Sequence, residues 1–191
     1  MVLTPREIWA VIHGMMLGSL FLLAYAGGLA ELINLGSKWS TEAGIAARVR
    51  RLTSGTWVMA VVAWLTVITG TYIVYPWYRA PLPPGADLKM FPKALLVASP
   101  NTAGWHNFGM EWKEHVAWLA PIAMTMVAYV FAKYGPGLAK QPQIRKAVIG
   151  FAVVAFVATG VAGAFGAMLN KYAPIRGGAV ITIVAGEQEG E

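Results

Sequence analysis

Four long apolar runs dominate the chain, and stretches rich in polar and turn-forming residues separate them. The runs span residues 8–35, 56–76, 115–132 and 147–169. A helix needs about 20 residues to cross the roughly 30 Å of hydrocarbon in a bilayer, and each run is close to this length. A transmembrane barrel would instead show short segments of alternating polarity. The pattern predicts an all-α, integral membrane four-helix bundle. Its helices are expected at about 5–35, 56–76, 108–133 and 146–170.

The segments around these runs complete a single membrane domain over residues 1–191. The first run follows Thr4-Pro5-Arg6-Glu7, where threonine can cap a helix, proline suits its first position, and glutamate can complete a capping box. This run is long for the apolar part of a signal peptide, so we expect it to be a retained helix. Proline and glycine are frequent in the connection 77–107, which is expected on the membrane surface. The polar tail 180–191 is expected to be mobile.

Composition and charge support a membrane protein and narrow its chemistry. The chain is 57% hydrophobic and only 13% charged. Its net charge of +6 does not predict a nucleic-acid partner, because the basic residues lie near helix ends, where membrane proteins usually carry them. The absence of cysteine excludes disulfides, cysteine-linked haem and cysteine-ligated iron–sulfur clusters within this chain. Motifs of metalloproteases, nucleotide-binding proteins and serine hydrolases are also absent, so no catalytic residue is predicted.

The distribution of basic residues predicts how the helices lie across the membrane. The short segments 36–55 and 133–146 together hold eight of the fifteen lysines and arginines and a single acid, Glu42. Basic short loops favour the cytoplasmic side. We therefore expect a multi-pass protein of a bacterial-type inner membrane, with both termini and the 77–107 connection outside.

This topology brings two of the three histidines to the same side of the membrane. His13 lies in the outer half of the first helix, and His115 lies in the first turns of the third. An imidazole in hydrocarbon needs a polar partner, and two neutral imidazoles on facing helices can coordinate one haem iron. We therefore predict His13 and His115 as metal ligands; the open alternatives are interhelical hydrogen bonding for His13 and contact with water for His115. His106 is expected at the surface, with alternative roles as ligand in place of His115 or in contact with a quinone.

Other residues are candidates for holding the same cofactor. Gly14 and Gly18 follow His13 and leave room for a flat ligand, although small residues of this kind more often serve helix packing. Trp112 offers aromatic packing. The basic residues expected on the outer side are candidates for pairing with haem propionates: Arg6, Arg79, Lys113 and Arg176. Lys113 and Glu114 are otherwise expected at the membrane boundary, facing water or head groups.

Four membrane helices with a histidine on each of two helices resemble the small membrane-anchored b-type cytochromes, which include haem-bearing anchor subunits of respiratory enzymes and b561-like proteins. The resemblance rests on the topology and on His13 and His115. It departs from the b561 pattern of two haem-ligand pairs on opposite faces, because this chain has histidines for one face. The resemblance implies electron transfer through one haem b, between a quinone pool and an extracytoplasmic redox partner. That partner would be a c-type cytochrome or a redox subunit, and other membrane subunits and lipid are further expected partners.

The chain is expected to act as an electron-transfer subunit of an oxidoreductase complex rather than as a stand-alone enzyme. Two other functions fit the same pattern. The main alternative is a non-redox accessory subunit that holds lipid, quinone or pigment within a larger respiratory or photosynthetic complex. Aromatic residues in and near the outer connection favour docking to a partner. A haem sensor or haem-handling protein is a third possibility. Bound haem with a redox-active spectrum separates the first function from the accessory role.

Overall fold

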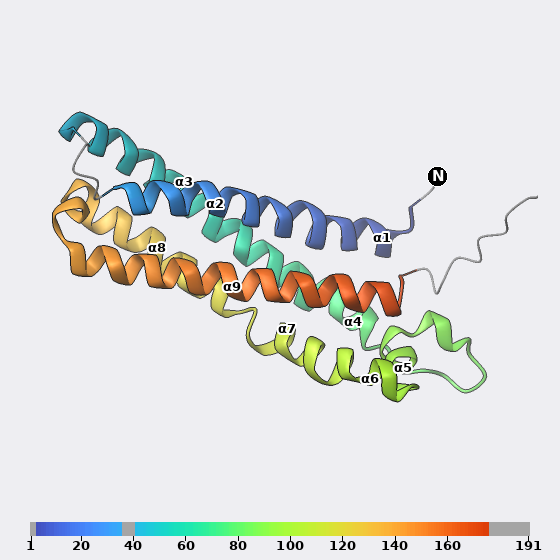
Figure 1. Ribbon diagram of the computed structural model, residues 1–191. Coiled ribbons are helices and arrows are strands. Elements are labelled where there is room, and N and C mark those ends of the chain that lie inside the picture. The colour runs from blue at the N-terminus through green and yellow to red at the C-terminus, as the bar shows by residue number, and fades with distance from the viewer. Residues whose placement is uncertain (1–2, 36–40, 176–191) are drawn as a thin grey trace, which may run out of the picture.

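The computed structural model describes residues 3–35 and 41–175, and every regular element in these residues is helical (Figure 1). Four helical stretches are long and apolar enough to cross a membrane: Pro5–Asn34, Glu42–Tyr78, Pro100–Lys140 and Pro142–Tyr172. This arrangement confirms the predicted all-α bundle. The chain is accordingly treated as a multi-pass membrane protein.

Each of the first three spans is built from several helical segments. The first comprises α1 (Pro5–Ala10), η1 (Val11–Gly18) and α2 (Ser19–Asn34). The second comprises α3 (Glu42–Thr69), η2 (Gly70–Val74) and α4 (Tyr75–Tyr78). The connection contains η3 (Leu88–Met90) and α5 (Pro92–Val97). The third comprises α6 (Pro100–Gly104), η4 (Trp105–Met110), α7 (Glu111–His115), α8 (Leu119–Tyr134) and η5 (Gly135–Lys140), and the fourth is α9 (Pro142–Tyr172).

Side-chain caps and prolines define where the helices start. Thr4 and Glu7 form the predicted capping box: the backbone N–H of Thr4 donates to Glu7 Oε2 at 2.7 Å. Thr41 caps α3 by accepting from the backbone N–H of Gly44 at 3.1 Å. The second helix therefore begins at Glu42, not near residue 56, and the third begins at Pro100, not near residue 108. Hydropathy detects only the apolar part of a helix, whereas a well-capped helix continues into polar sequence.

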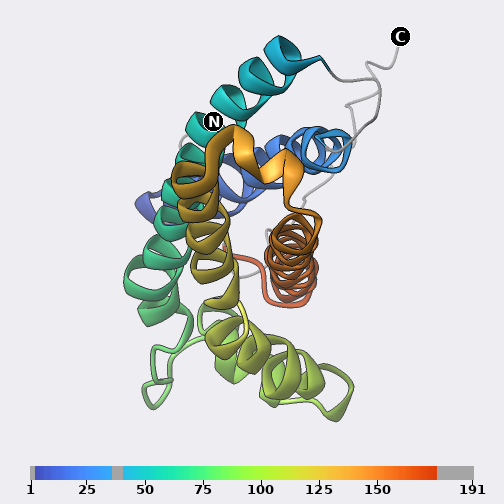
Figure 2. The same ribbon diagram turned by 90° about the vertical axis from the view of Figure 1, so that its left-hand side faces the viewer.

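The four spans form a ring in which neighbouring helices pack along their lengths. The α8 helix contacts both α3 and α9, and α2 contacts the same two helices. Figure 2 shows α3 and α8 side by side, with α9 beside them. The end of α2, the start of α3 and the segment between α8 and α9 lie at one end of the bundle (Figure 1), and α1, α4 and the end of α9 lie at the other. Which of these ends faces the cytoplasm stays a prediction. The tail 180–191, which was expected to be mobile, lies outside the described residues.

The third span changes direction between α7 and α8. Residues 116–118 form turns instead of continuing the α-helix. Pro121 explains this break, because proline lacks the N–H that would bond to the carbonyl of Ala117, and its ring crowds that carbonyl. The break displaces α6, η4 and α7 from the axis of α8, as Figure 1 shows.

The interior of the bundle is rich in alanine, and larger apolar side chains face outward. The exposed outer surface includes Leu23, Met15 and Val58, of which 75%, 68% and 62% are accessible. The buried alanines on α3, α8 and α9 include Ala60, Ala63, Ala123, Ala128, Ala152, Ala155 and Ala158. Small interior residues let membrane helices approach closely, while lipid covers large apolar side chains on the outside. The core thus has the character of a membrane bundle.

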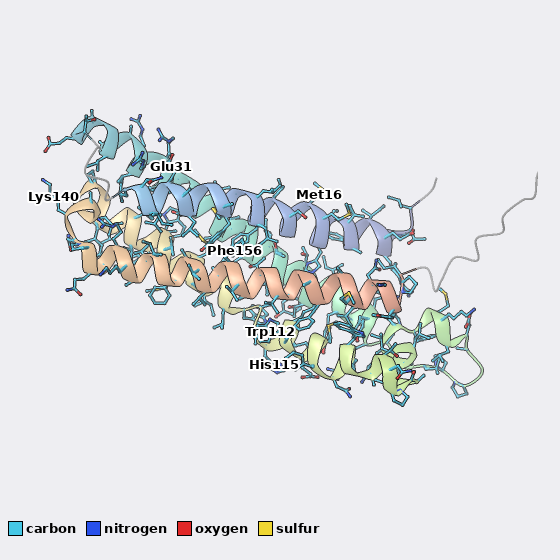
Figure 3. The ribbon with its side chains drawn as sticks, in the orientation of Figure 1. Met16, Glu31, Trp112, His115, Lys140 and Phe156 are labelled. Atoms are coloured by element: carbon cyan, nitrogen blue, oxygen red, sulfur yellow. The ribbon has the colours of Figure 1, made fainter. Side chains whose placement is uncertain are left out.

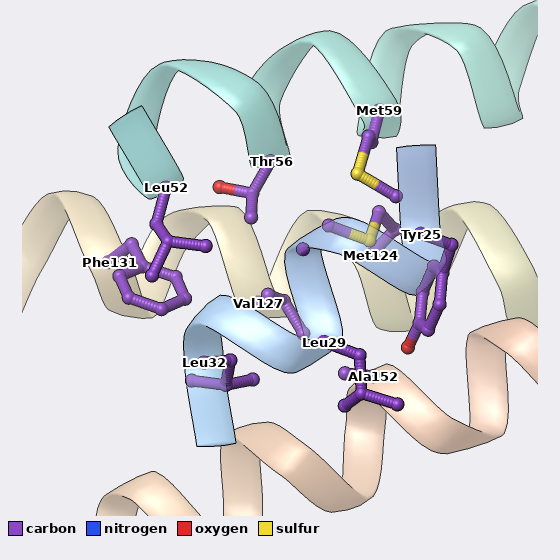
Figure 4. A pocket seen from close by; sticks show the side chains of 11 residues that line it. Tyr25, Leu29, Leu32, Leu52, Thr56, Met59, Met124, Val127, Phe131 and Ala152 are labelled. Carbon is purple, nitrogen blue, oxygen red and sulfur yellow. The ribbon is translucent and has the colours of Figure 1, made fainter. Parts of the chain in front are cut away.

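A small apolar pocket lies among α2, α3, α8 and α9, in the half of the bundle that holds the end of α2 and the start of α3. Figure 4 shows its wall, which includes Tyr25, Met59, Met124 and Phe131. Its volume is about 20 Å³, space for about one water molecule. This half of the bundle is therefore close-packed, and a larger ligand has to bind elsewhere.

One interhelical hydrogen bond offers a test of this packing. The indole N–H of Trp64 on α3 donates to Thr125 Oγ1 on α8 at 3.0 Å. We expect Trp64→Phe and Thr125→Val each to lower the free energy of unfolding, and their coupling energy to be about 0.6–1.7 kcal/mol. Unfolding titrations of both single variants and the double variant in sodium dodecyl sulfate measure this coupling. Purely additive losses would show that the bond contributes nothing.

Candidate functional site

Three π-helical segments meet in the half of the bundle that holds α1, α4 and the end of α9. They are η1, η2 and η4, one on each of the first three spans. His13 lies in η1, His106 lies in η4, and Gly70 of η2 contacts the ring of His13. Single π-helical turns are rare and often mark functional sites. Their presence on three neighbouring helices points to this half of the bundle.

A cavity of about 830 Å³ occupies this half. Its volume lies within the range of about 300–1,000 Å³ that is typical of sites for small molecules and cofactors. All four spans contribute to its wall, which is mostly apolar. The polar and titratable wall residues are His13, Ser19, Thr66, Thr71, Tyr75, Tyr78, Lys113, Glu114, His115, Thr159 and Asn170.

His13 projects from η1 towards the second span. Its Nδ1 lies 2.8 Å from the backbone carbonyl oxygen of Thr66. A carbonyl only accepts, so Nδ1 carries the proton and the neutral ring keeps its lone pair on Nε2. Gly70 makes room for the ring: a Cβ at that position would lie 2.5 Å from Cε1 of His13. The ring is therefore held in one tautomer and one position.

His115 lies on α7 (Figure 3), and it is among the residues that line the same cavity. Its Nδ1 donates to the backbone carbonyl of Glu111 at 2.9 Å and lies 3.7 Å from Glu111 Oε2. This arrangement again leaves the lone pair on Nε2. The side chain is 72% accessible, far more open than that of His13. The structure thus places both predicted ligands on one cavity wall, one enclosed and one at the rim.

His106 is buried, and the expectation of a surface histidine is wrong. Only 6% of the residue is accessible, and its Nδ1 lies 2.9 Å from the Tyr78 hydroxyl. Although glycines flank the stretch from Trp105 to Phe108, it belongs to a π-helical segment that packs against Phe165 and Tyr172 of α9. His106 does not line the cavity; it contacts the phenol of Tyr78, which does. The apolar spacing of Trp105, Phe108 and Trp112 was the available sequence signal for a buried helix.

Lys113 reaches from α7 to α9 and lines the cavity. Its Nζ donates to the carbonyl oxygen of Ala162 at 3.1 Å. Gly166 leaves space for the ammonium group, because a Cβ there would lie 2.9 Å from Nζ. No ion pair of Lys113 with a carboxylate is present in residues 3–35 and 41–175. A positive charge is thus fixed on a wall that is otherwise largely apolar.

The other predicted cofactor contacts divide into two groups. Gly14 and Gly18 line the cavity, as expected of residues beside His13. Arg6, Arg79 and Trp112 are not among the wall residues. Arg6 lies over the ring of Trp77 at 5.3 Å, and Trp112 packs against Phe165 at 6.2 Å between ring centroids. Arg176 lies outside the described residues.

Three residues of the cavity wall were not predicted from the sequence. Tyr75, Tyr78 and Glu114 belong to its wall. Glu114 was expected to face water or head groups, but only 19% of its side chain is accessible, and Oε2 lies 3.6 Å from Nη1 of Arg79. Arg79 in turn donates to the hydroxyl of Tyr75. This polar cluster joins side chains at the end of the second span and on α7, which are far apart in the sequence, so the sequence carries no local signal for it.

The described part of the chain does not support a metal site made of three or more protein ligands. There, no group of three or more histidine, cysteine, aspartate or glutamate side chains lies close enough to hold a metal ion. A haem iron needs only two axial ligands from the protein, so this observation leaves the two-histidine hypothesis open.

Comparisons with protein-family models, curated proteins and solved structures find no match to this chain.

Proposed function

We propose that this chain is a membrane cytochrome b subunit. It holds one haem b and transfers electrons between the quinone pool and an extracytoplasmic redox partner, such as a c-type cytochrome. The observation that carries the proposal is the position of His13 and His115 on the wall of one cavity of about 830 Å³, each with Nδ1 donating to a backbone carbonyl. Ligating histidines characteristically use their second nitrogen in this way, which orients the ring.

The chemistry of the wall residues and the volume of the cavity support the choice of a haem. His13 and His115 would supply axial nitrogen ligands through Nε2. Gly14, Gly18 and Gly163 leave the wall free of bulky side chains on two helices. Lys113 supplies a positive charge suited to a propionate carboxylate. When bound, the haem supplies one-electron redox chemistry, and the protein adjusts its potential through ligands, burial and nearby charge.

The absorption spectrum of the purified full chain tests the proposal. We expect the reduced-minus-oxidised spectrum to show a b-type α-band, and His115→Ala to retain haem through His13 with the spectrum of a site that has lost one axial ligand. Circular dichroism establishes that each sample is folded. A folded wild-type chain without haem would overturn the proposal. An unchanged spectrum in His115→Ala would overturn the assignment of His115.

A non-redox accessory subunit is the second candidate function, and the surface of the connection favours it. Leu82, Met90 and Val97 lie outside the four spans and are 41–44% accessible. Apolar side chains exposed beyond the hydrocarbon are typical of contacts with a partner protein. The two functions differ in bound haem, so the same spectrum separates them.

A further inference from the structure

Glu114 presents an unsatisfied hydrogen-bond acceptor at the cavity. Glu114 belongs to the wall, and its Oε2 lies 3.6 Å from Nη1 of Arg79. The other oxygen, Oε1, is shielded from solvent and has no hydrogen-bond partner in the described part of the chain. A buried polar atom without a partner is costly, and the cost is greater for a charged group. A ligand that donates a hydrogen bond would remove this cost.

Aromatic and hydroxyl groups surround this acceptor. Tyr75 and Tyr78 form the adjacent wall, and their rings stack with centroids 6.4 Å apart. The hydroxyl of Tyr78 is already engaged with the buried His106, and that of Tyr75 accepts from Arg79 and is hydrogen-bonded to the Glu114 carboxylate. Both phenols are thus held in place by these partners. The surroundings suit a flat aromatic head group whose own hydroxyl points at Glu114.

We propose that Glu114 accepts a hydrogen bond from the hydroxyl of a hydroquinone head group, and that this contact makes the site selective for the reduced form. The inference rests on the proposed function and deepens it by naming the residue that recognises the electron donor. A hydroquinone offers two O–H donors. The oxidised quinone offers only carbonyl acceptors, which a carboxylate oxygen repels. Selectivity therefore follows from Oε1, the oxygen of the Glu114 carboxylate that has no hydrogen-bond partner in the described part of the chain.

Binding of a short-chain hydroquinone to the full chain tests this inference. The probes are decyl-1,4-hydroquinone and its dimethyl ether, which has the same ring and tail but no donor. The protein is kept reduced under argon so that no electron transfer accompanies binding, and tryptophan fluorescence reports the titration. We expect wild type to bind the hydroquinone about tenfold more tightly than the ether, as a hydrogen bond to a charged group implies. Glu114→Gln should lower this preference to within about twofold.

Glu111→Gln is the matched control. Glu111 lies on the same short helix, α7, but its side chain is 47% accessible and it is not a wall residue. This variant should retain the wild-type preference. Equal binding of the two probes by wild type would overturn the inference without any variant, and so would an unchanged preference in folded Glu114→Gln.

The haem spectrum of the same samples separates this inference from the proposed function. A b-type spectrum without hydroquinone selectivity would leave the haem proposal standing and overturn the role of Glu114. Hydroquinone selectivity without haem would support the binding site and overturn electron transfer through this chain.

Discussion

Under the proposed function, replacing His13 with alanine should abolish haem binding. His13 is the better enclosed of the two predicted ligands, and the Thr66 carbonyl and the space at Gly70 fix its ring. Loss of a group that merely orients a ligating histidine costs about 10–100-fold in affinity, so loss of the ligand itself should cost more than about 100-fold. Haem content per chain and the α-band of the reduced protein measure the effect. We expect both to fall to background in His13→Ala.

The third histidine provides the control for this result. His106 is buried and contacts Tyr78, but it is not part of the cavity wall. His106→Ala should therefore retain the haem content of the wild type. This result would show that removal of a buried histidine does not by itself prevent haem binding. A full b-type spectrum in His13→Ala would exclude His13 as ligand. Equal loss of haem in both variants, with intact helix content, would instead favour His106 as a ligand.

A methyl group added at Gly70 should disturb the same site while leaving every histidine in place. The new Cβ would lie 2.5 Å from Cε1 and 3.1 Å from Nδ1 of His13, closer than a side chain can tolerate. Movement of the ring away from the new Cβ would disturb its 2.8 Å hydrogen bond to the Thr66 carbonyl. Overpacking of this kind typically costs about 1–3 kcal/mol. Gly70→Ala should thus lower both the free energy of unfolding and the haem occupancy.

Gly55 offers a matched control on the same membrane span. It lies in α3, and a Cβ at this position would have no neighbour within 4 Å. Gly55→Ala should leave haem content unchanged and, through its higher helix propensity, stabilise the chain by up to about 1 kcal/mol. Unfolding titrations and haem spectra of the two variants give the comparison. Wild-type occupancy in Gly70→Ala would show that the position of the His13 ring is unimportant for binding.

Much of the architecture followed from local sequence. Apolar runs of membrane-spanning length predict helices because hydrocarbon offers no partner for backbone N–H and C=O groups. The capping box at Thr4 and Glu7 was predictable because both of its hydrogen bonds are made within four residues. The start of the second helix was missed because residues 42–55 lie in polar sequence. There Arg48 pairs with Glu31 of α2 at 2.7 Å, a contact that hydropathy does not report.

The candidate site was predictable only in part. The sequence identified His13, His115, Lys113, Gly14 and Gly18, all of which line the cavity. These residues stand out by themselves, as polar or small side chains in or beside apolar runs. Tyr78 and Glu114 do not stand out in this way. Their roles arise from contacts with His106 and Arg79, which belong to other segments of the chain.

The sequence by itself determined the class of this protein, the approximate positions of its four spans, and the residues able to carry polar chemistry within them. The tertiary structure decided which of those residues share a cavity, that His106 is buried behind Tyr78, and that Glu114 faces inward. The reason is physical: hydropathy and capping act within one segment, over a few residues. A cavity wall depends instead on how each helix is rotated about its axis, and packing against neighbouring helices sets that rotation.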